Sequence, residues 1–234
     1  MKKIKKILAA NRSEIAIRIF RAAEESGIKT AAIYSKEDRF ALHRFKTDES
    51  YLLGEGKGPI QAYLDIPSII KIAKNANVDA IHPGYGFLSE SPELAQACLD
   101  NNITFIGPTV EILKKLGNKT EAKKVAKQAN IDTIPSLLVD IENIKLVEKE
   151  VSNIGYPVMI KASWGGGGRG MRIVRDADKL VSQISDAKSE AKKAFGKDEV
   201  FIEKYLENAA HIEVQILGDN HGNIIHLFER DCSI

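Results

Sequence analysis

The chain has 234 residues, of which 44% are apolar and 28% charged, as in ordinary soluble globular proteins. Its net charge of +2 gives no general reason to expect nucleic-acid or membrane binding. The two cysteines, Cys98 and Cys232, form no CxxC pair, which argues against a disulfide framework or a structural zinc site. No signal peptide or membrane-spanning run is predicted, and we expect a cytoplasmic protein.

The first part of the chain predicts alternating strands and helices. Strands are expected over 6–10, 29–35, 78–84 and 103–107, and helices over 13–26, 67–77 and 91–101. In the first helix, Ala16, Ile19, Phe20 and Ala23 recur at helical spacing, and Gly27 follows as a stop. This alternation predicts a parallel sheet with helices on its faces.

Two polar segments follow strands of this sheet, and the second of them carries glycines. They are "ANRSE" (10–14) and "HPGYGFLSE" (82–90). Ligands of such sheets bind beyond the carboxyl ends of the strands, so both segments are candidates for a site.

From about Thr109 the pattern changes. A basic helical region over 109–130 is interrupted near 117–118, and strands follow at 156–163, 170–175 and 200–206, with a helix over 177–195. The segment 211–234 predicts a hairpin with one buried face. We therefore expect an α/β fold, in which a Rossmann-like parallel-sheet domain precedes an α+β domain of mostly antiparallel strands.

The segment "KASWGGGGRGMR" (161–172) lies between two of these strands. Glycines there allow backbone N–H groups to approach anionic oxygens, and Arg169 adds charge. Lys161 and Lys119 are compact cations suited to phosphate. The alternatives are a surface loop without a ligand and solvated lysines. The segment is not a Walker loop, and "AANRSE" does not match G-x-G-x-x-G, so the first sheet shows no dinucleotide fingerprint.

Four further residues carry charge within apolar strand patterns. Glu203 and Lys204 interrupt "VFIEKYL", which suggests a site or, alternatively, an edge strand with one wet face. His211 and Glu213 are two residues apart and are expected on the same strand face, which suits a site or a solvent-facing stripe equally well.

Together these segments resemble the biotin carboxylase domain of the ATP-grasp enzymes. The motifs occur in order, from "ANRSEIAIRIFRA" through "HPGYGFLSE", "GNK", "IKASWGGGGRGMR", "EKYLE" and "HIEVQILGD" to "ERDCS". Within that family, Ser13, Trp164 and the segments 43–51 and 218–233 are most similar to pyruvate carboxylases. The resemblance implies an N-terminal biotin carboxylase domain over 1–113 and the first portion of a truncated ATP-grasp domain over 114–234.

The resemblance also implies a reaction. ATP activates bicarbonate as carboxyphosphate, and its carbon dioxide equivalent passes to N1 of a biotin carried on a separate domain. In pyruvate carboxylases another domain then carboxylates pyruvate to oxaloacetate. The alternatives are the biotin carboxylase of an acetyl-CoA or propionyl-CoA carboxylase, another ATP-grasp ligase that joins a carboxylate to an amine, and an inactive nucleotide-binding fragment.

The matching positions take roles by the same resemblance. Lys119 and Lys161 would contact ATP phosphates under a lid, and Glu203, Lys204 and Leu206 would hold adenine and ribose, with His211 nearby. The lid residues are Gly165, Gly166, Gly167, Gly168, Arg169 and Gly170. Tyr85, Gly86 and Glu90 would line the bicarbonate and biotin side.

Catalytic residues and Mg²⁺ ligands are expected after Ile234. We expect the chain to be the N-terminal portion of a longer, homo-oligomeric protein. By itself it should be inactive and should expose apolar surface.

Overall fold

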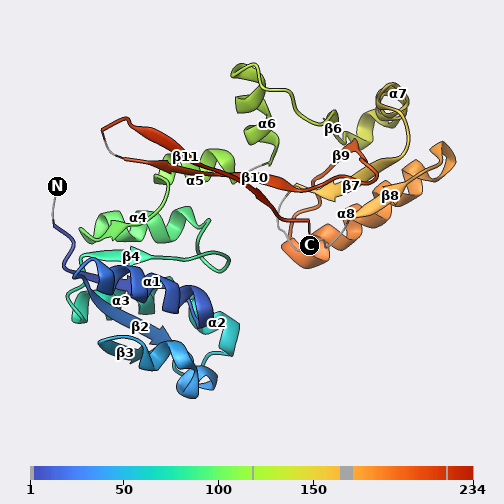
Figure 1. Cartoon of the computed structure of the whole chain (residues 1–234). Helices are drawn as coiled ribbons and strands as arrows, with labels where there is room; N and C mark the ends of the chain where they lie inside the picture. Colours follow the sequence, from blue (N-terminus) through green and yellow to red (C-terminus); the bar gives the residue numbers. More distant parts are fainter. Residues whose placement is uncertain (1–2, 118, 164–170, 220, 234) are drawn as a thin grey trace. The chain divides into compact units, whose positions relative to one another are not determined.

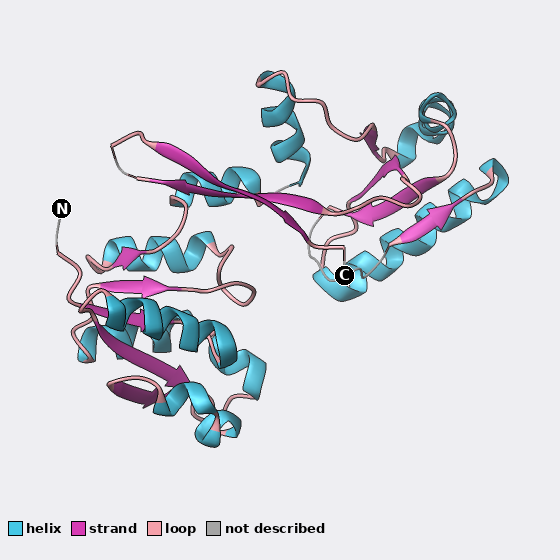
Figure 2. Cartoon of the chain, in the orientation of Figure 1, coloured by secondary structure: helices cyan, strands magenta, loops and turns pink. Residues whose placement is uncertain are grey.

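The computed structural model describes residues 3–117, 119–163, 171–219 and 221–233, without the side chains of 119, 120 and 195. The predicted lid, residues 165–170, therefore lies outside the described residues. The chain divides into two compact units, Met1–Ala122 and Lys123–Ile234. Figures 1 and 2 show their helices and strands. No helix among the described residues is long and apolar enough to cross a membrane.

The first unit contains a five-stranded sheet in the order β3-β2-β1-β4-β5, with every pair parallel. Its strands are β1 (Lys6–Ala9), β2 (Lys29–Tyr34), β3 (Glu49–Leu52), β4 (Ala80–His82) and β5 (Thr104–Phe105). The chain moves from β1 through β2 to β3 and then returns to the other side of β1. The strand order therefore reverses between β1 and β4, where sheets of this class bind ligands.

Helices cover both faces of this sheet, as predicted. They are α1 (Ser13–Glu25), α2 (Pro59–Tyr63), α3 (Ile66–Asn75), α4 (Pro92–Asp100) and α5 (Val110–Leu116), with 3-10 turns η1 (Glu37–Phe40) and η2 (Leu42–Phe45). The predicted apolar stripe of α1 is buried in one cluster with Ile7 and Ala9. Leu8, whose side chain points to the opposite face, belongs to a second cluster with residues of α3 and α4.

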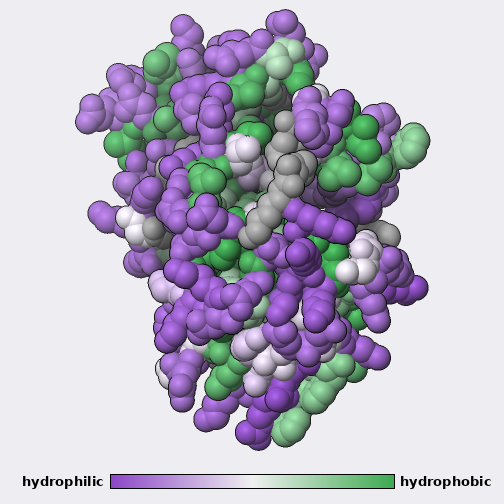
Figure 3. Space-filling model, turned by 90° about the vertical axis from the view of Figure 1, so that its left-hand side faces the viewer, coloured by the Kyte–Doolittle hydropathy of each residue, from purple (hydrophilic) through white to green (hydrophobic). Residues whose placement is uncertain are grey.

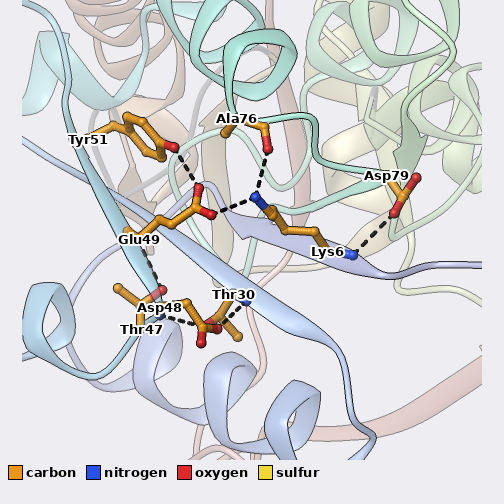
Figure 4. Close-up of polar contacts among 8 residues, drawn as sticks. All are labelled: Lys6, Thr30, Thr47, Asp48, Glu49, Tyr51, Ala76 and Asp79. Atoms are coloured by element: carbon orange, nitrogen blue, oxygen red, sulfur yellow. Dashed lines mark hydrogen bonds and ion pairs between the residues drawn. The ribbon is translucent and has the colours of Figure 1, made fainter.

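Polar contacts fix the amino end of β1 (Figure 4). The Lys6 ammonium donates to Glu49 at 2.6 Å and to the Ala76 carbonyl at 2.9 Å. Glu49 also accepts a hydrogen bond from the Tyr51 hydroxyl at 2.6 Å, and Asp79 accepts one from the Lys6 backbone N–H at 3.2 Å. These contacts hold the amino end of β1, and the carboxyl end of the sheet carries the candidate site.

The second unit contains a four-stranded antiparallel sheet in the order β6-β9-β7-β8. Its strands are β6 (Ser136–Leu138), β7 (Val158–Ala162), β8 (Arg172–Val174) and β9 (Val200–Lys204). Its helices are α7 (Ile144–Ile154) and α8 (Leu180–Phe195), with turns η3 (Ile141–Asn143) and η4 (Ala177–Lys179), while α6 (Lys119–Gln128) begins in the first unit. The predicted change from a parallel to an antiparallel sheet is confirmed.

Helices α7 and α8 cover one face of this sheet. Val158 and Ile160 of β7 are fully buried in a cluster with Val151 of α7 and Leu180 and Ile184 of α8. Because side chains alternate along a strand, the residues between them point to the opposite face. That face carries Lys161 and Glu203, two of the candidate nucleotide residues.

The final hairpin pairs β10 (Ile212–Gly218) with β11 (Ile224–Asp231), and its register shifts between Val214 and Ile216. The expectation of one buried face is wrong, because every residue of β11 is exposed and Phe228 reaches 70%. Alternation predicts a face suited to burial, but it does not say which element covers that face. The face of the molecule in Figure 3 is largely hydrophilic, with separate hydrophobic areas among the polar side chains.

Candidate functional site

The segments that follow β1 and β4 meet at the carboxyl edge of the first sheet, as predicted. Together they line a shallow pocket of about 310 Å³, formed by residues 11–15 and 85–87. The register of the sheet brings them together, because Ala9 of β1 lies opposite His82 of β4. The pocket therefore lies where the strand order reverses.

Asn11 connects the two segments. Its buried side-chain amide donates to the carbonyls of Pro83 at 2.7 Å and Tyr85 at 2.8 Å, and its oxygen accepts from the backbone N–H of Arg12 at 2.8 Å. Gly84 lies close by with φ +67°, and a Cβ atom there would come within 2.8 Å of the Asn11 amide nitrogen. One buried asparagine thus fixes the shape of the loop that carries Tyr85.

Arg12 forms a second connection to this loop. Its guanidinium donates to Asp38 at 3.1 Å and lies 5.6 Å from the centroids of both Tyr63 and Phe87. The two rings stack with centroids 5.1 Å apart, and the Tyr63 hydroxyl donates to Asp38 at 2.8 Å. Burial opposes the ionisation of Asp38, but the Tyr63 and Arg12 hydrogen bonds outweigh it and lower the pKa of that carboxyl.

Tyr85 and Gly86 line the pocket, and Glu90 does not. The Tyr85 hydroxyl donates to the Glu14 carboxylate, which raises the pKa of the tyrosine and lowers that of Glu14. Tyr85 is 60% exposed, Gly86 has φ +65°, and Glu90 is exposed. The carboxyl edge of the sheet thus presents an accessible tyrosine on a loop that Asn11 and Arg12 hold in position.

The second group of candidate residues lies on the face of the β6–β9 sheet opposite α7 and α8. Lys161 of β7 pairs with Phe201 of β9, and Met159 pairs with Glu203. These four side chains therefore point to the same face. Lys161 donates to Oε1 of Glu203, so the structure brings two predicted site residues into contact.

A second lysine, Lys123 of α6, binds the same carboxylate. Its ammonium donates to Oε2 of Glu203 at 3.2 Å and lies 5.6 Å from the centroid of the Phe201 ring. Burial opposes the ionisation of Glu203, but the hydrogen bonds and charges of Lys161 and Lys123 prevail, so its pKa is lowered. Glu203 is thus a buried carboxylate between two cations, and the cluster of the three side chains has a net positive charge.

The other predicted residues of β9 lie differently. Lys204 pairs with Val158 and so points to the helix-covered side, where its ammonium donates to the Gly155 and Tyr156 carbonyls at 3.0 Å each. Leu206 follows the strand and is 48% exposed. Because β9 lies between β6 and β7, the alternative of an edge strand is wrong.

His211 precedes the hairpin and is exposed. Its backbone N–H donates to the Ser233 hydroxyl at 2.7 Å, and its carbonyl accepts from the N–H of Cys232 at 2.7 Å. Glu213 forms an ion pair with Arg230 at 2.5 Å across the hairpin. These contacts place both residues in the base of the hairpin.

Sequence reasoning assigned no role to Lys123 or Arg12. Lys123 follows Lys119 by four residues in α6, a spacing that puts both on one side of a helix and that could have identified it. Arg12 lies within the segment 10–14, but its aromatic partners come from distant parts of the chain. Among the described residues, no group of three or more His, Cys, Asp or Glu side chains is placed to hold a metal ion.

Two protein families match the chain. The family described as "Biotin carboxylase, N-terminal domain" matches residues 3–113, and "Carbamoyl-phosphate synthase L chain, ATP binding domain" matches residues 118–234. Pyruvate carboxylase of Staphylococcus aureus is 56% identical over 234 residues, which are 100% of this chain and 20% of the relative. Human mitochondrial pyruvate carboxylase is 52% identical over 233 residues, again 20% of its length. The chain thus spans about a fifth of these relatives.

Solved structures agree with these matches. The biotin carboxylase domain of the Hydrogenobacter thermophilus 2-oxoglutarate carboxylase, in complex with MgADP, ADP and bicarbonate, superposes with a TM-score of 0.91 at 46% identity. The match covers 100% of this chain and 51% of that one. With its parallel first sheet, its antiparallel second sheet and its two matched families, the chain belongs to the biotin carboxylases of the ATP-grasp type.

Proposed function

We propose that this chain supplies the nucleotide-binding part of a biotin-dependent carboxylase, of the kind that carboxylates pyruvate in the whole enzyme. The observation that carries the proposal is the cluster of Lys161, Glu203 and Lys123, which has a net positive charge on the face of an ATP-grasp sheet opposite α7 and α8. The 56% identity to a pyruvate carboxylase supports pyruvate as the final acceptor of the carboxyl group. We propose domain limits of 1–113 and 114–234.

The hydrogen-bonding groups of this face fit ATP. Lys161 offers an ammonium to a phosphate oxygen, and Glu203 is ionised and able to accept from a ribose hydroxyl or a base N–H group. Lys204 and Leu206 would contribute backbone groups at the end of β9, because the Lys204 side chain is engaged elsewhere. Lys119, the lid residues 165–170 and His211 keep the roles that the family resemblance gives them.

The first unit would bind the second substrate. In this proposal, Tyr85 and Gly86 face bicarbonate and biotin, and Asn11 and Arg12 hold their loop in position. Glu90 keeps its predicted role at the same edge, although it lies outside the pocket. Biotin, carried on a separate domain, supplies the nitrogen that accepts the carboxyl group. The H. thermophilus domain, solved with MgADP and bicarbonate and as a dimer, supports ATP, Mg²⁺, bicarbonate and a homo-oligomeric state.

Calorimetry of ATP binding with Mg²⁺ tests the proposal, on the 234 residues and on the full-length protein that carries them. We expect the full-length protein to bind and Lys161→Gln to weaken its affinity about tenfold through the loss of one charged phosphate contact. Lys127→Gln is the matched control, because Lys127 is exposed on α6. If ATP fails to bind the full-length protein, the proposal is wrong. If Lys161→Gln binds ATP normally, the assignment of Lys161 is wrong.

A further inference from the structure

The cluster of Lys123, Lys161 and Glu203 contains two ammonium groups and one carboxylate. Each ammonium binds a different oxygen, since Lys161 donates to Oε1 and Lys123 to Oε2. All three side chains are shielded from solvent, with exposed fractions of 25% for Lys161, 27% for Lys123 and 11% for Glu203. Solvent therefore screens their charges less than it would on the open surface.

Lys123 is held from three directions. Besides Glu203, its ammonium donates to the Ile134 carbonyl at 3.2 Å and lies 5.6 Å from the centroid of Phe201. These partners belong to the segment before β6 and to β9, while Lys123 itself belongs to α6. A lysine anchored in this way stays beside the carboxylate when its neighbour moves.

The carboxylate of Glu203 disfavours phosphate binding nearby, and Lys123 offsets this effect. The negative charge of Glu203 repels an incoming phosphate and also holds the Lys161 ammonium. With a single lysine, removing that ammonium would leave a buried carboxylate without a partner, which is costly. With Lys123 in place, Glu203 keeps one cation while Lys161 turns to the ligand.

We propose that Lys123 is a positioning residue of the nucleotide site, which neutralises Glu203 and so releases Lys161 for the phosphates. This inference rests on the proposed function and extends it, because it assigns to a residue of α6 the preference for a charged nucleotide over its nucleoside. Lys123 itself need not touch the ligand. Its effect is electrostatic and therefore depends on the charge of the ligand.

The test compares the binding of ATP and adenosine to the full-length protein by calorimetry. Lys123→Gln should weaken ATP binding about tenfold and adenosine binding less than about twofold, because the nucleoside carries no phosphate. Lys123→Arg keeps the charge and should stay within about threefold of the wild type for both ligands. Lys127→Gln removes the same charge at an exposed position one helical turn further along α6 and should change neither affinity.

A second background separates the electrostatic role from a structural one. In Glu203→Gln there is no carboxylate to neutralise, so adding Lys123→Gln should weaken ATP binding by less than about twofold. This double variant also removes both partners of the pair, which keeps the test usable if Lys123→Gln alone unfolds.

The inference is overturned if Lys123→Gln weakens adenosine as much as ATP, if it leaves ATP binding unchanged, or if its full effect persists in the Glu203→Gln background. Failure of the wild-type protein to bind ATP is a different result. It would refute the proposed function and the role of Lys123 with it.

Discussion

Replacing Arg12 by alanine should destabilise the first unit by about 2.5 kcal/mol. A hydrogen bond to a charged group contributes about 1.5–3 kcal/mol, and a cation–π contact at an exposed site about 0.5–1 kcal/mol. Arg12 makes one such bond, to Asp38 at 3.1 Å, and two ring contacts at 5.6 Å. Because its side chain is 36% exposed, solvent screens these interactions, and the lower part of the combined range applies.

The effect of this substitution should depend on pH. Burial raises the pKa of Asp38, but Tyr63 and Arg12 outweigh it and the net shift is downward. A carboxyl group whose folded pKa is lowered stabilises the protein above its unfolded pKa, and this stabilisation is lost as the pH falls through the folded value. The difference between wild type and Arg12→Ala should therefore be full at pH 7 and shrink below about pH 4.

Hydrogen exchange of the amides of β1 and β2 is the appropriate assay, because a protein with two compact units need not unfold in one step. The control is Arg21→Ala, since Arg21 is 69% exposed and, among the described residues, forms an ion pair only with its helical neighbour Glu25. Arg21→Ala should lower the stability of the first unit by no more than about 0.5 kcal/mol. Equal protection in the two variants would refute the account of Arg12.

Two further predictions concern the first unit. Gly84→Ala should destabilise this unit by about 2 kcal/mol, because a Cβ atom would lie 2.8 Å from the Asn11 amide nitrogen and the backbone has φ +67°. A loss of stability below about 0.5 kcal/mol, measured by hydrogen exchange, would contradict this close approach. Burial raises the pKa of the Cys98 thiol to about 12, so iodoacetamide at pH 8 should label Cys232 in the native protein and leave Cys98 unmodified until the protein is denatured. Fast labelling of Cys98 in the native state, detected by mass spectrometry, would show that its site opens.

The sequence predicted those parts of the fold whose pattern is long and periodic. The stripe of α1 repeats over several turns; its start and its buried face agree with the structure, and its end differs by one residue. Strands β3 and β6, of four and three residues, were not predicted, and none of their residues is buried. Helix α7 has an apolar stripe whose residues Val147 and Val151 are buried, and this helix was not predicted from the sequence.

The candidate site was predictable where its parts are close in sequence or at the ends of neighbouring strands. The meeting of residues 10–14 and 82–90 follows from the parallel order of β1 and β4. The bond between Lys123 and Glu203 spans 80 residues and depends on how α6 packs beside β9, which no local pattern contains. The same holds for the contact of Arg12 with Tyr63 and Phe87.

The position of β9 between two strands determines which groups of the cluster can move. Glu203 is paired with Met159 on one side and Ser136 on the other, so its backbone moves only if the whole sheet moves. The ammonium of Lys161, in contrast, lies at the end of four rotatable bonds. Rearrangement around an arriving anion is therefore a rotamer change, which takes picoseconds to nanoseconds when unhindered, rather than a movement of strands, which takes microseconds or longer. Any slow step in ligand entry must then arise outside this cluster.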